Sequence, residues 1–183
     1  MRRFVRLLAA LAVAGSAAAG AVASTTPAAA AAHGPAVCST RWGTNAKHGG
    51  SNGTVRTPVL GVRAGKHGCF DRLVVDLGSG PKPPFSAQYV RHIVAQGSGR
   101  VLKVRGHARI SIVVRGPAGR HYRANAVNLV NVSGFKTFRQ VRGAGSFERV
   151  TAIGLGVRAK LPFRVFLLGS PASSWRLIVD VAH

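Results

Sequence analysis

Short apolar runs alternate with polar, glycine-rich turns along most of the chain, and turn sequences such as residues 78–81 and 143–145 separate them. Short runs rich in Val, Ile and Phe between Gly and Pro are typical of strands, and no stretch combines a helical period with helix caps. The pattern predicts an all-β sandwich or barrel of about ten short strands, with at most one helical turn near 120–125 or 144–148. The predicted strands are 59–63, 70–77, 87–94, 101–105, 108–114, 127–132, 137–142, 147–157, 163–168 and 175–181.

Two predicted strands carry nearly the same sequence, in which an arginine, three apolar residues and an aspartate follow one another. The two copies run from Arg72 to Asp76 and from Arg176 to Asp180. Because side chains alternate between the faces of a strand, the arginine and the aspartate of each copy share one face. If the copies pair antiparallel, Arg72 lies opposite Asp180 and Asp76 opposite Arg176, and each pair adds about 0.2–1 kcal/mol and fixes the register. We therefore expect structural ion pairs at Asp76 and Asp180.

The first 32 residues are predicted to be a signal peptide. Three arginines within the first six residues precede an uncharged, alanine-rich run from Leu7 to Ala23, and alanines continue to Ala32. This order is typical of an export signal that is removed, and no later segment is long and apolar enough to span a membrane. We expect a secreted protein; a twin-arginine route and an uncleaved anchor are the alternatives to general secretion with cleavage.

A glycine-rich arm is predicted at residues 33–57, followed by one domain at 58–183. The arm is poor in large apolar residues apart from Trp42. Cys38, in the arm, and Cys69 are the two cysteines of the chain, and an even number in an oxidising compartment favours one disulfide. Closing a loop of about 32 residues would contribute about 3–4 kcal/mol on the chain-entropy estimate and would tie the arm to the domain.

Positive charge dominates the composition, with 26 Lys and Arg against four Asp and Glu, a formal net charge of +22. Removing the three arginines of the signal leaves 26 − 3 = 23 basic residues and a charge of +19. Such a surface attracts polyanions, which outside a cell are wall polymers, anionic lipid headgroups and stray nucleic acid. Charge alone supports nucleic-acid binding, because the chain lacks a recognised binding module, and we expect no specific nucleic-acid partner.

Several motifs resemble, in order, the AMIN-like domain of secreted actinobacterial proteins. They are residues 61–77, 88–90, 97–99, 145–148, 162–166 and 176–183, preceded by Cys38 and by Trp42-Gly43. The resemblance implies a compact β-sandwich similar to the AMIN domain, which targets cell-wall amidases to peptidoglycan. Peptidoglycan is carried over from the AMIN domain as the expected partner. The resemblance does not imply an activity, and we expect a non-enzymatic protein.

The candidate binding residues are basic and are expected to form one face of the sandwich. They are Arg63, Lys66, His67, Arg72, Arg164 and Arg176, of which the first four surround one turn. We expect this face to hold an anionic wall polymer at the cell wall. One alternative is an interaction module for an envelope enzyme, with its basic charge only retaining it in the wall.

A cell-wall hydrolase is the other alternative, and the acids it could use include Asp71 and Glu148. A carboxylate pair must converge on one bond, whereas Asp76 and Asp180 are explained by ion pairs. Seven histidines show none of the spacings of a zinc site, so neither a metal nor a cofactor is expected. The strand aromatics Phe70, Phe163, Phe166 and Trp175 are expected in the core.

Overall fold

The computed structural model describes residues 38, 40–51 and 56–183; the predicted signal peptide, 1–32, lies outside the described residues. Eleven strands and no helix are present in the described part, which confirms the predicted all-β sandwich. The strands are β1 (Lys47–Gly49), β2 (Val59–Lys66), β3 (Phe70–Leu77), β4 (Phe85–Val90), β5 (Ile93–Val94), β6 (Val101–Leu102), β7 (Ala108–Arg115), β8 (Phe138–Phe147), β9 (Val150–Val157), β10 (Phe163–Gly169) and β11 (Trp175–Ala182).

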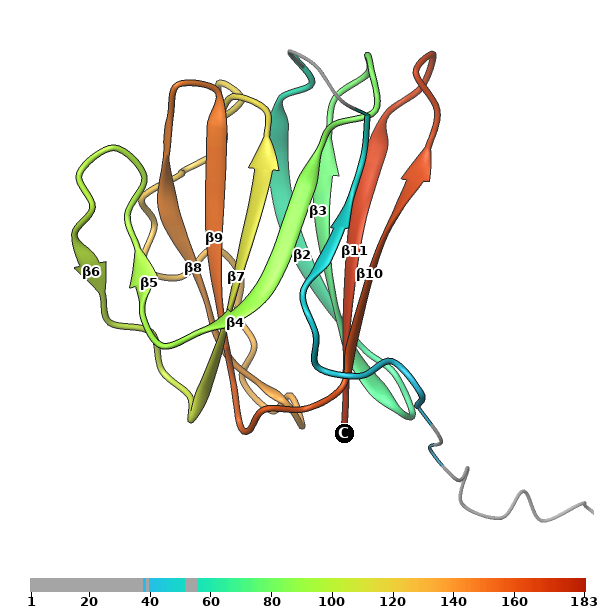
Figure 1. Cartoon of the computed structure of the whole chain (residues 1–183), viewed down its shortest axis with the longest axis vertical. Coiled ribbons are helices and arrows are strands. Elements are labelled where there is room, and N and C mark those ends of the chain that lie inside the picture. The colour runs from blue at the N-terminus through green and yellow to red at the C-terminus, as the bar shows by residue number, and fades with distance from the viewer. Residues whose placement is uncertain (1–37, 39, 52–55) are drawn as a thin grey trace, which may run out of the picture. The chain divides into compact units, whose positions relative to one another are not determined.

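Two antiparallel sheets pack face to face, one in the order β1-β4-β7-β9-β8 and the other in the order β10-β11-β3-β2 (Figure 1). Their inward-facing apolar side chains form the main core, which includes Leu73, Ile110, Phe138 and Phe163, none of them more than 1% exposed. A two-stranded ribbon, β5-β6, lies to one side of the larger sheet and covers a smaller apolar cluster (Figure 1). The alternation of apolar and polar residues thus becomes an inner and an outer face for each sheet.

The repeated strands β3 and β11 are neighbours at the centre of the four-stranded sheet. They pair antiparallel, with Arg72 opposite Asp180 and Asp76 opposite Arg176. The predicted register is therefore confirmed, and the repeat places both copies' arginine and aspartate on the outer face.

Some predicted elements differ from those observed. Residues 127–132 form no strand, because only Val130 pairs with β8 and the chain then leaves the sheet in a turn where the Asn131 side chain accepts the Ser133 N–H. The predicted strand 87–94 is divided between β4 and β5 by a turn. Neither expected helical turn forms: residues 144–147 belong to β8, and 120–125 lie in irregular turns.

Residues 147–157 do not form one strand, because a tight two-residue turn follows Phe147. Glu148 and Arg149 both have positive φ, 47° and 62°, as the commonest two-residue hairpin turns require. Phe147 therefore ends β8, and Val150 begins β9.

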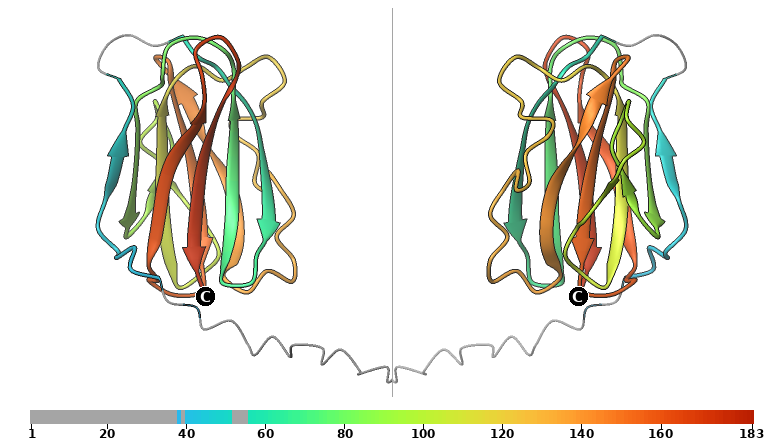
Figure 2. Two further views of the ribbon diagram at one scale, coloured as in Figure 1. Left: turned by 90° about the vertical axis from the view of Figure 1, so that its right-hand side faces the viewer. Right: turned by 90° about the vertical axis from the view of Figure 1, so that its left-hand side faces the viewer.

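Two irregular segments cover the open sides of the sandwich (Figure 2). On one side, residues 116–137 join the edge strands: Gly119 N donates to Val59 O of β2, and Gly143 N of β8 donates to Ala126 O, each at 2.8 Å. On the other side, the segment predicted as an arm supplies β1, which pairs with β4, while Gly43 O accepts the Phe163 N–H of β10 at 3.0 Å.

Asp71 connects the two sheets through the interior. It is fully buried at the start of β3, and its Oδ2 accepts the backbone N–H groups of Thr137 at 2.6 Å and Phe138 at 3.1 Å, where β8 begins. Its Oδ1 lies 3.3 Å from Nε2 of His183. The carboxylate is therefore satisfied by two buried donors that would otherwise have no partner.

Replacing Asp71 should destabilise the domain. Asp71→Ala leaves two buried N–H groups unpaired, so we expect the free energy of unfolding to fall by about 2–4 kcal/mol, measured by urea denaturation. Asp71→Asn keeps one acceptor oxygen and should lose less. Equal losses for the two variants would contradict the role given to these hydrogen bonds.

Candidate binding site

Four arginines lie on the outer face of the four-stranded sheet, away from the core. Arg164 of β10, Asp180 of β11 and Arg72 of β3 lie in one cross-strand row. A second row contains Arg63 of β2, and Arg176 lies opposite Asp76 one row further along. Strand alternation explains why all these residues share one face.

Asp180 is the centre of this face. Its carboxylate is fully buried and accepts Arg72 Nε at 2.7 Å and Nη2 at 2.9 Å, and Arg164 Nε at 2.8 Å. The hydrogen bond to Asp180 raises the pKa of Arg72 above its ordinary value, despite the opposing effect of burial. One carboxylate thus holds two guanidinium groups in fixed orientations.

Asp76 has a different partner from the one predicted. Although Arg176 lies opposite it, Asp76 accepts two hydrogen bonds from Arg63, from Nε at 2.9 Å and from Nη2 at 3.0 Å. This planar, two-bond contact is the geometry that guanidinium and carboxylate groups favour, and it raises the pKa of Arg63. Among the described residues, Arg176 is within salt-bridge distance of no carboxylate.

A hollow of about 300 Å³ lies on this face, and Arg63, His67, Arg72 and Arg176 all line it. The remaining lining residues are Ala64, Gly65, Val74, Leu168 and Ile178. The structure therefore brings four of the six sequence-predicted binding residues around one concave surface. Arg164 does not line the hollow, but it shares the carboxylate of Asp180 with Arg72, which does.

Lys66 lies apart from the hollow. It follows Gly65 on β2, so its side chain leaves the strand on the other side, and its ammonium group lies 5.3 Å from the centroid of the Phe135 ring. The turn between β2 and β3 therefore sends its two neighbouring basic residues in different directions: His67 to the hollow, Lys66 toward residues 134–135.

Aromatic rings surround the arginines on this face. The Arg164 guanidinium lies 4.4 Å from the Trp42 ring centroid, 5.5 Å from that of Phe70 and 5.3 Å from that of Phe166. Phe163 and Trp175 are buried, as expected, but Phe70 and Phe166 are only partly buried on the outer face, so their expected place in the core was wrong. Their positions follow from strand alternation, since Asp71 and Val165, the neighbours of these residues, point inward.

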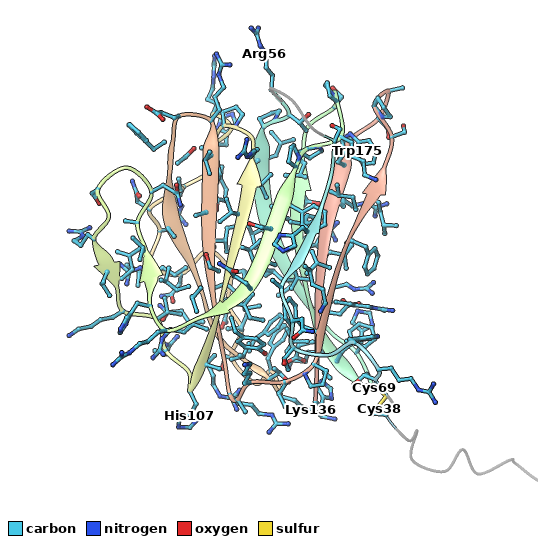
Figure 3. The ribbon with its side chains drawn as sticks, in the orientation of Figure 1. Cys38, Arg56, Cys69, His107, Lys136 and Trp175 are labelled. Atoms are coloured by element: carbon cyan, nitrogen blue, oxygen red, sulfur yellow. A yellow bond between two sulfur atoms is a disulfide. The ribbon has the colours of Figure 1, made fainter. Side chains whose placement is uncertain are left out.

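The disulfide Cys38–Cys69 is present, as predicted, at the lower end of the sandwich in Figure 3. It joins the segment before β1 to the turn that precedes Phe70. Four residues after Cys38, Trp42 packs edge-on against Phe70 with ring centroids 5.6 Å apart. The covalent link therefore helps to keep Trp42 on the outer face of the four-stranded sheet.

The described part of the chain offers few side chains that are free to act in catalysis or to bind a metal. No group of three or more His, Cys, Asp and Glu side chains there is arranged to hold a metal. Asp71, Asp76 and Asp180 are each engaged by donors, and Glu148 lies exposed in the turn between β8 and β9. Residues 38, 40–51 and 56–183 include no helix long and apolar enough to cross a membrane.

The fold and the site define an antiparallel β-sandwich with a basic, partly aromatic surface, the form of a binding module. Residues 57–183 match the AMIN-like domain, and because this match covers more than half of the chain, the protein belongs to the AMIN-like domain family. Membership indicates a cell-wall-related binding module. No curated protein and no solved structure matches the chain. The segment with Cys38, Trp42 and β1 lies outside the matched range.

The two aspartates of the face should differ strongly in their contribution to stability. Asp180→Asn removes a buried charge that two arginines depend on, and we expect a loss of about 2–4 kcal/mol in the free energy of unfolding. Asp76→Asn affects a solvent-exposed pair and should cost less than about 1 kcal/mol. Chemical denaturation at neutral pH compares them, and a larger loss for Asp76→Asn would contradict this ranking.

Removing the disulfide should loosen the Trp42 segment as well as destabilise the domain. For Cys38→Ser/Cys69→Ser we expect a loss of about 3–4 kcal/mol and increased solvent quenching of tryptophan fluorescence below the melting temperature. Trp175 is buried and serves as the internal reference. Reductant should reproduce the effect in the parent protein and leave the variant unchanged; unaltered quenching in both would contradict the proposed link to Trp42.

Proposed function

We propose that this protein is an exported, non-enzymatic component of the cell envelope that binds an anionic wall polymer, peptidoglycan. The observation that carries the proposal is the basic hollow lined by Arg63, Arg72 and Arg176 on the outer face of the four-stranded sheet. Peptidoglycan presents carboxylates on its peptide stems. The planar guanidinium fork matches a carboxylate better than an ammonium group does.

The net charge of this face favours an anionic ligand, although the face carries both arginines and aspartates. Four arginines and two aspartates leave a charge of 4 − 2 = +2. Asp180 orients Arg72 and Arg164, and Asp76 orients Arg63, so the remaining donors of these groups are held ready for a ligand. Preorganised side chains lose less conformational entropy on binding than free ones.

The aromatic side chains support a glycan as the ligand. Trp42, Phe70 and Phe166 lie partly exposed beside the arginines and offer some apolar ring surface. A sugar ring has an apolar C–H face and polar edges, which suits a site that combines aromatic rings with charged donors. The same face can therefore contact the sugar chain and the carboxylates of its peptide stems together.

Binding to an insoluble wall, rather than hydrolysis of it, agrees with the state of the carboxylates. Glycoside hydrolysis uses two carboxyl groups placed on either side of one bond. Here Asp76 and Asp180 are neutralised by arginines on the same face, and Asp71 is buried between the sheets. The disulfide also suits a protein that works in an oxidising compartment outside the cytoplasm.

Co-sedimentation with purified peptidoglycan, stripped of secondary polymers, tests the proposal. We expect Arg63→Gln/Arg176→Gln to weaken binding about tenfold or more at about 150 mM salt, because two guanidinium contacts to carboxylates are lost. The matched control is Arg56→Gln/Arg100→Gln, which removes the same charge at exposed positions outside the hollow. It should weaken binding only slightly.

Two results would contradict the proposal. Equal losses for the two double variants would mean that net charge alone retains the protein. Binding that is present on whole walls and absent on stripped peptidoglycan would assign the ligand to a secondary polymer. Survival of binding at about 500 mM salt, where exposed charges are strongly screened, is the result expected for a specific site.

A further inference from the structure

A second hollow, larger than the one on the proposed binding face, is formed beside β8 by the long connection between β7 and β8. Its volume is about 560 Å³, and it is lined by Arg105, residues 128–135, Phe138 and Arg139. None of these residues lines the first hollow. The volume is within the range of small-molecule sites, about 300–1,000 Å³.

A buried glutamine holds the walls of this hollow together. Gln140 is 5% exposed, and its Nε2 donates to Val127 O at 2.9 Å and to Asn128 Oδ1 at 3.2 Å. Its Oε1 accepts the backbone N–H of Arg105 at 2.8 Å. One side chain of β8 thus fixes both the loop on one wall and the segment that carries Arg105. The hollow is therefore preformed in the protein without a ligand.

The loop on the wall is shaped by its own hydrogen bonds. Leu129 N donates to Val141 O of β8 at 2.8 Å, and Asn131 Oδ1 accepts the Ser133 N–H at 2.9 Å. Asn128, Asn131 and Ser133 contribute amide and hydroxyl groups to the lining. These are the groups that pair with sugar hydroxyls, since each can donate and accept.

The charged groups at the hollow are all positive. Arg139 donates from Nη1 to Phe138 O at 2.9 Å and to Phe135 O at 3.2 Å, which fixes its guanidinium against the loop. Lys66 lies over Phe135, another lining residue. Among the described residues, neither Arg105 nor Arg139 is within salt-bridge distance of a carboxylate. The positive charge of these two arginines is therefore available to pair with an anionic ligand.

We propose that this second hollow binds a small saccharide that carries an oxyanion, either a carboxylate or a phosphate. Arg105 and Arg139 pair with the oxyanion, and the asparagines, Ser133 and the peptide groups of the loop pair with the hydroxyls. The site is separate from the face that holds the wall polymer. Its lining is concave, and residues 128–135 form one wall of it. We therefore expect it to take a soluble ligand or the end of a chain.

Calorimetric titration of the purified protein tests this site with three probes: a disaccharide with one uronic acid, a hexose phosphate, and a neutral disaccharide. We expect at least one anionic probe to bind and the neutral one to bind much more weakly. Arg105→Gln should weaken binding about 10- to 100-fold, because a charge-assisted hydrogen bond is lost. The probe that binds identifies the oxyanion.

A second variant and a control keep the test independent of folding. Asn131→Asp retains the oxygen that accepts the Ser133 N–H but places a negative charge in the hollow, so it should also weaken binding while the melting temperature changes little. Arg56→Gln is the control: Arg56 projects from the upper end of the sandwich, whereas Lys136, beside Phe135, lies at the lower end (Figure 3). It should bind as the parent protein does.

The proposal is overturned if neither anionic probe binds, if the neutral disaccharide binds equally well, or if Arg56→Gln loses as much affinity as Arg105→Gln. The Arg105→Gln variant should still co-sediment with peptidoglycan like the parent protein. Failure of the second site and failure of the wall-binding face are therefore observed in separate measurements.

Discussion

The antiparallel pairing of β3 with β11 determines most of what this molecule presents to its surroundings. It places the fully buried carboxylate of Asp180 between Arg72 and Arg164, so that a chain with very few acidic residues uses one of them to order two cations. The same register directs Leu73, Val75 and Leu77 into the core and leaves the arginines outside. A shift of one residue would reverse both faces, and the buried charge would lose its partners.

Because carboxylates are scarce, only a few charged side chains have a structural partner, and most of the positive charge is left at the surface. Asp71 joins the sheets through backbone N–H groups, while Asp76 and Asp180 orient arginines on the outer face. Among the residues that the structure describes, most other Lys and Arg side chains are within salt-bridge distance of no carboxylate and present a general attraction for polyanions. For the proposed ligand, we expect specificity to come from the few guanidinium groups whose orientation is fixed beside aromatic rings, and the remaining positive charge to raise the local concentration of the ligand.

Local patterns were enough to predict an all-β fold, the pairing of the repeated strands and the disulfide, because alternation and cysteine parity depend on the chain alone. The choice of a sandwich over a barrel came from the family resemblance. The partner of Asp76 could not be predicted, since it depends on β2 lying beside β3 and on which arginine reaches the carboxylate in a planar geometry. β1 was missed because Lys47, His48 and Gly49 show no apolar alternation; pairing with β4 makes them a strand. Phe70 and Phe166 were assigned to the core because a strand sequence alone does not say which face is covered. The contacts of Gln140 and the second hollow could not be predicted either. They depend on the loop between β7 and β8, where apolar and polar residues do not alternate regularly.

Chemical-shift mapping with a soluble peptidoglycan fragment shows where on the surface of the protein the ligand lies. If the ligand occupies the proposed site, the amide signals of Gly65, Val74 and Ile178, which line the basic hollow, should shift in a saturable manner at about 150 mM salt. Shifts that spread over exposed basic residues of the other sheet, such as Arg115, and that fail to saturate would contradict the proposed site. The protein would then be a polycation held at the wall by charge alone.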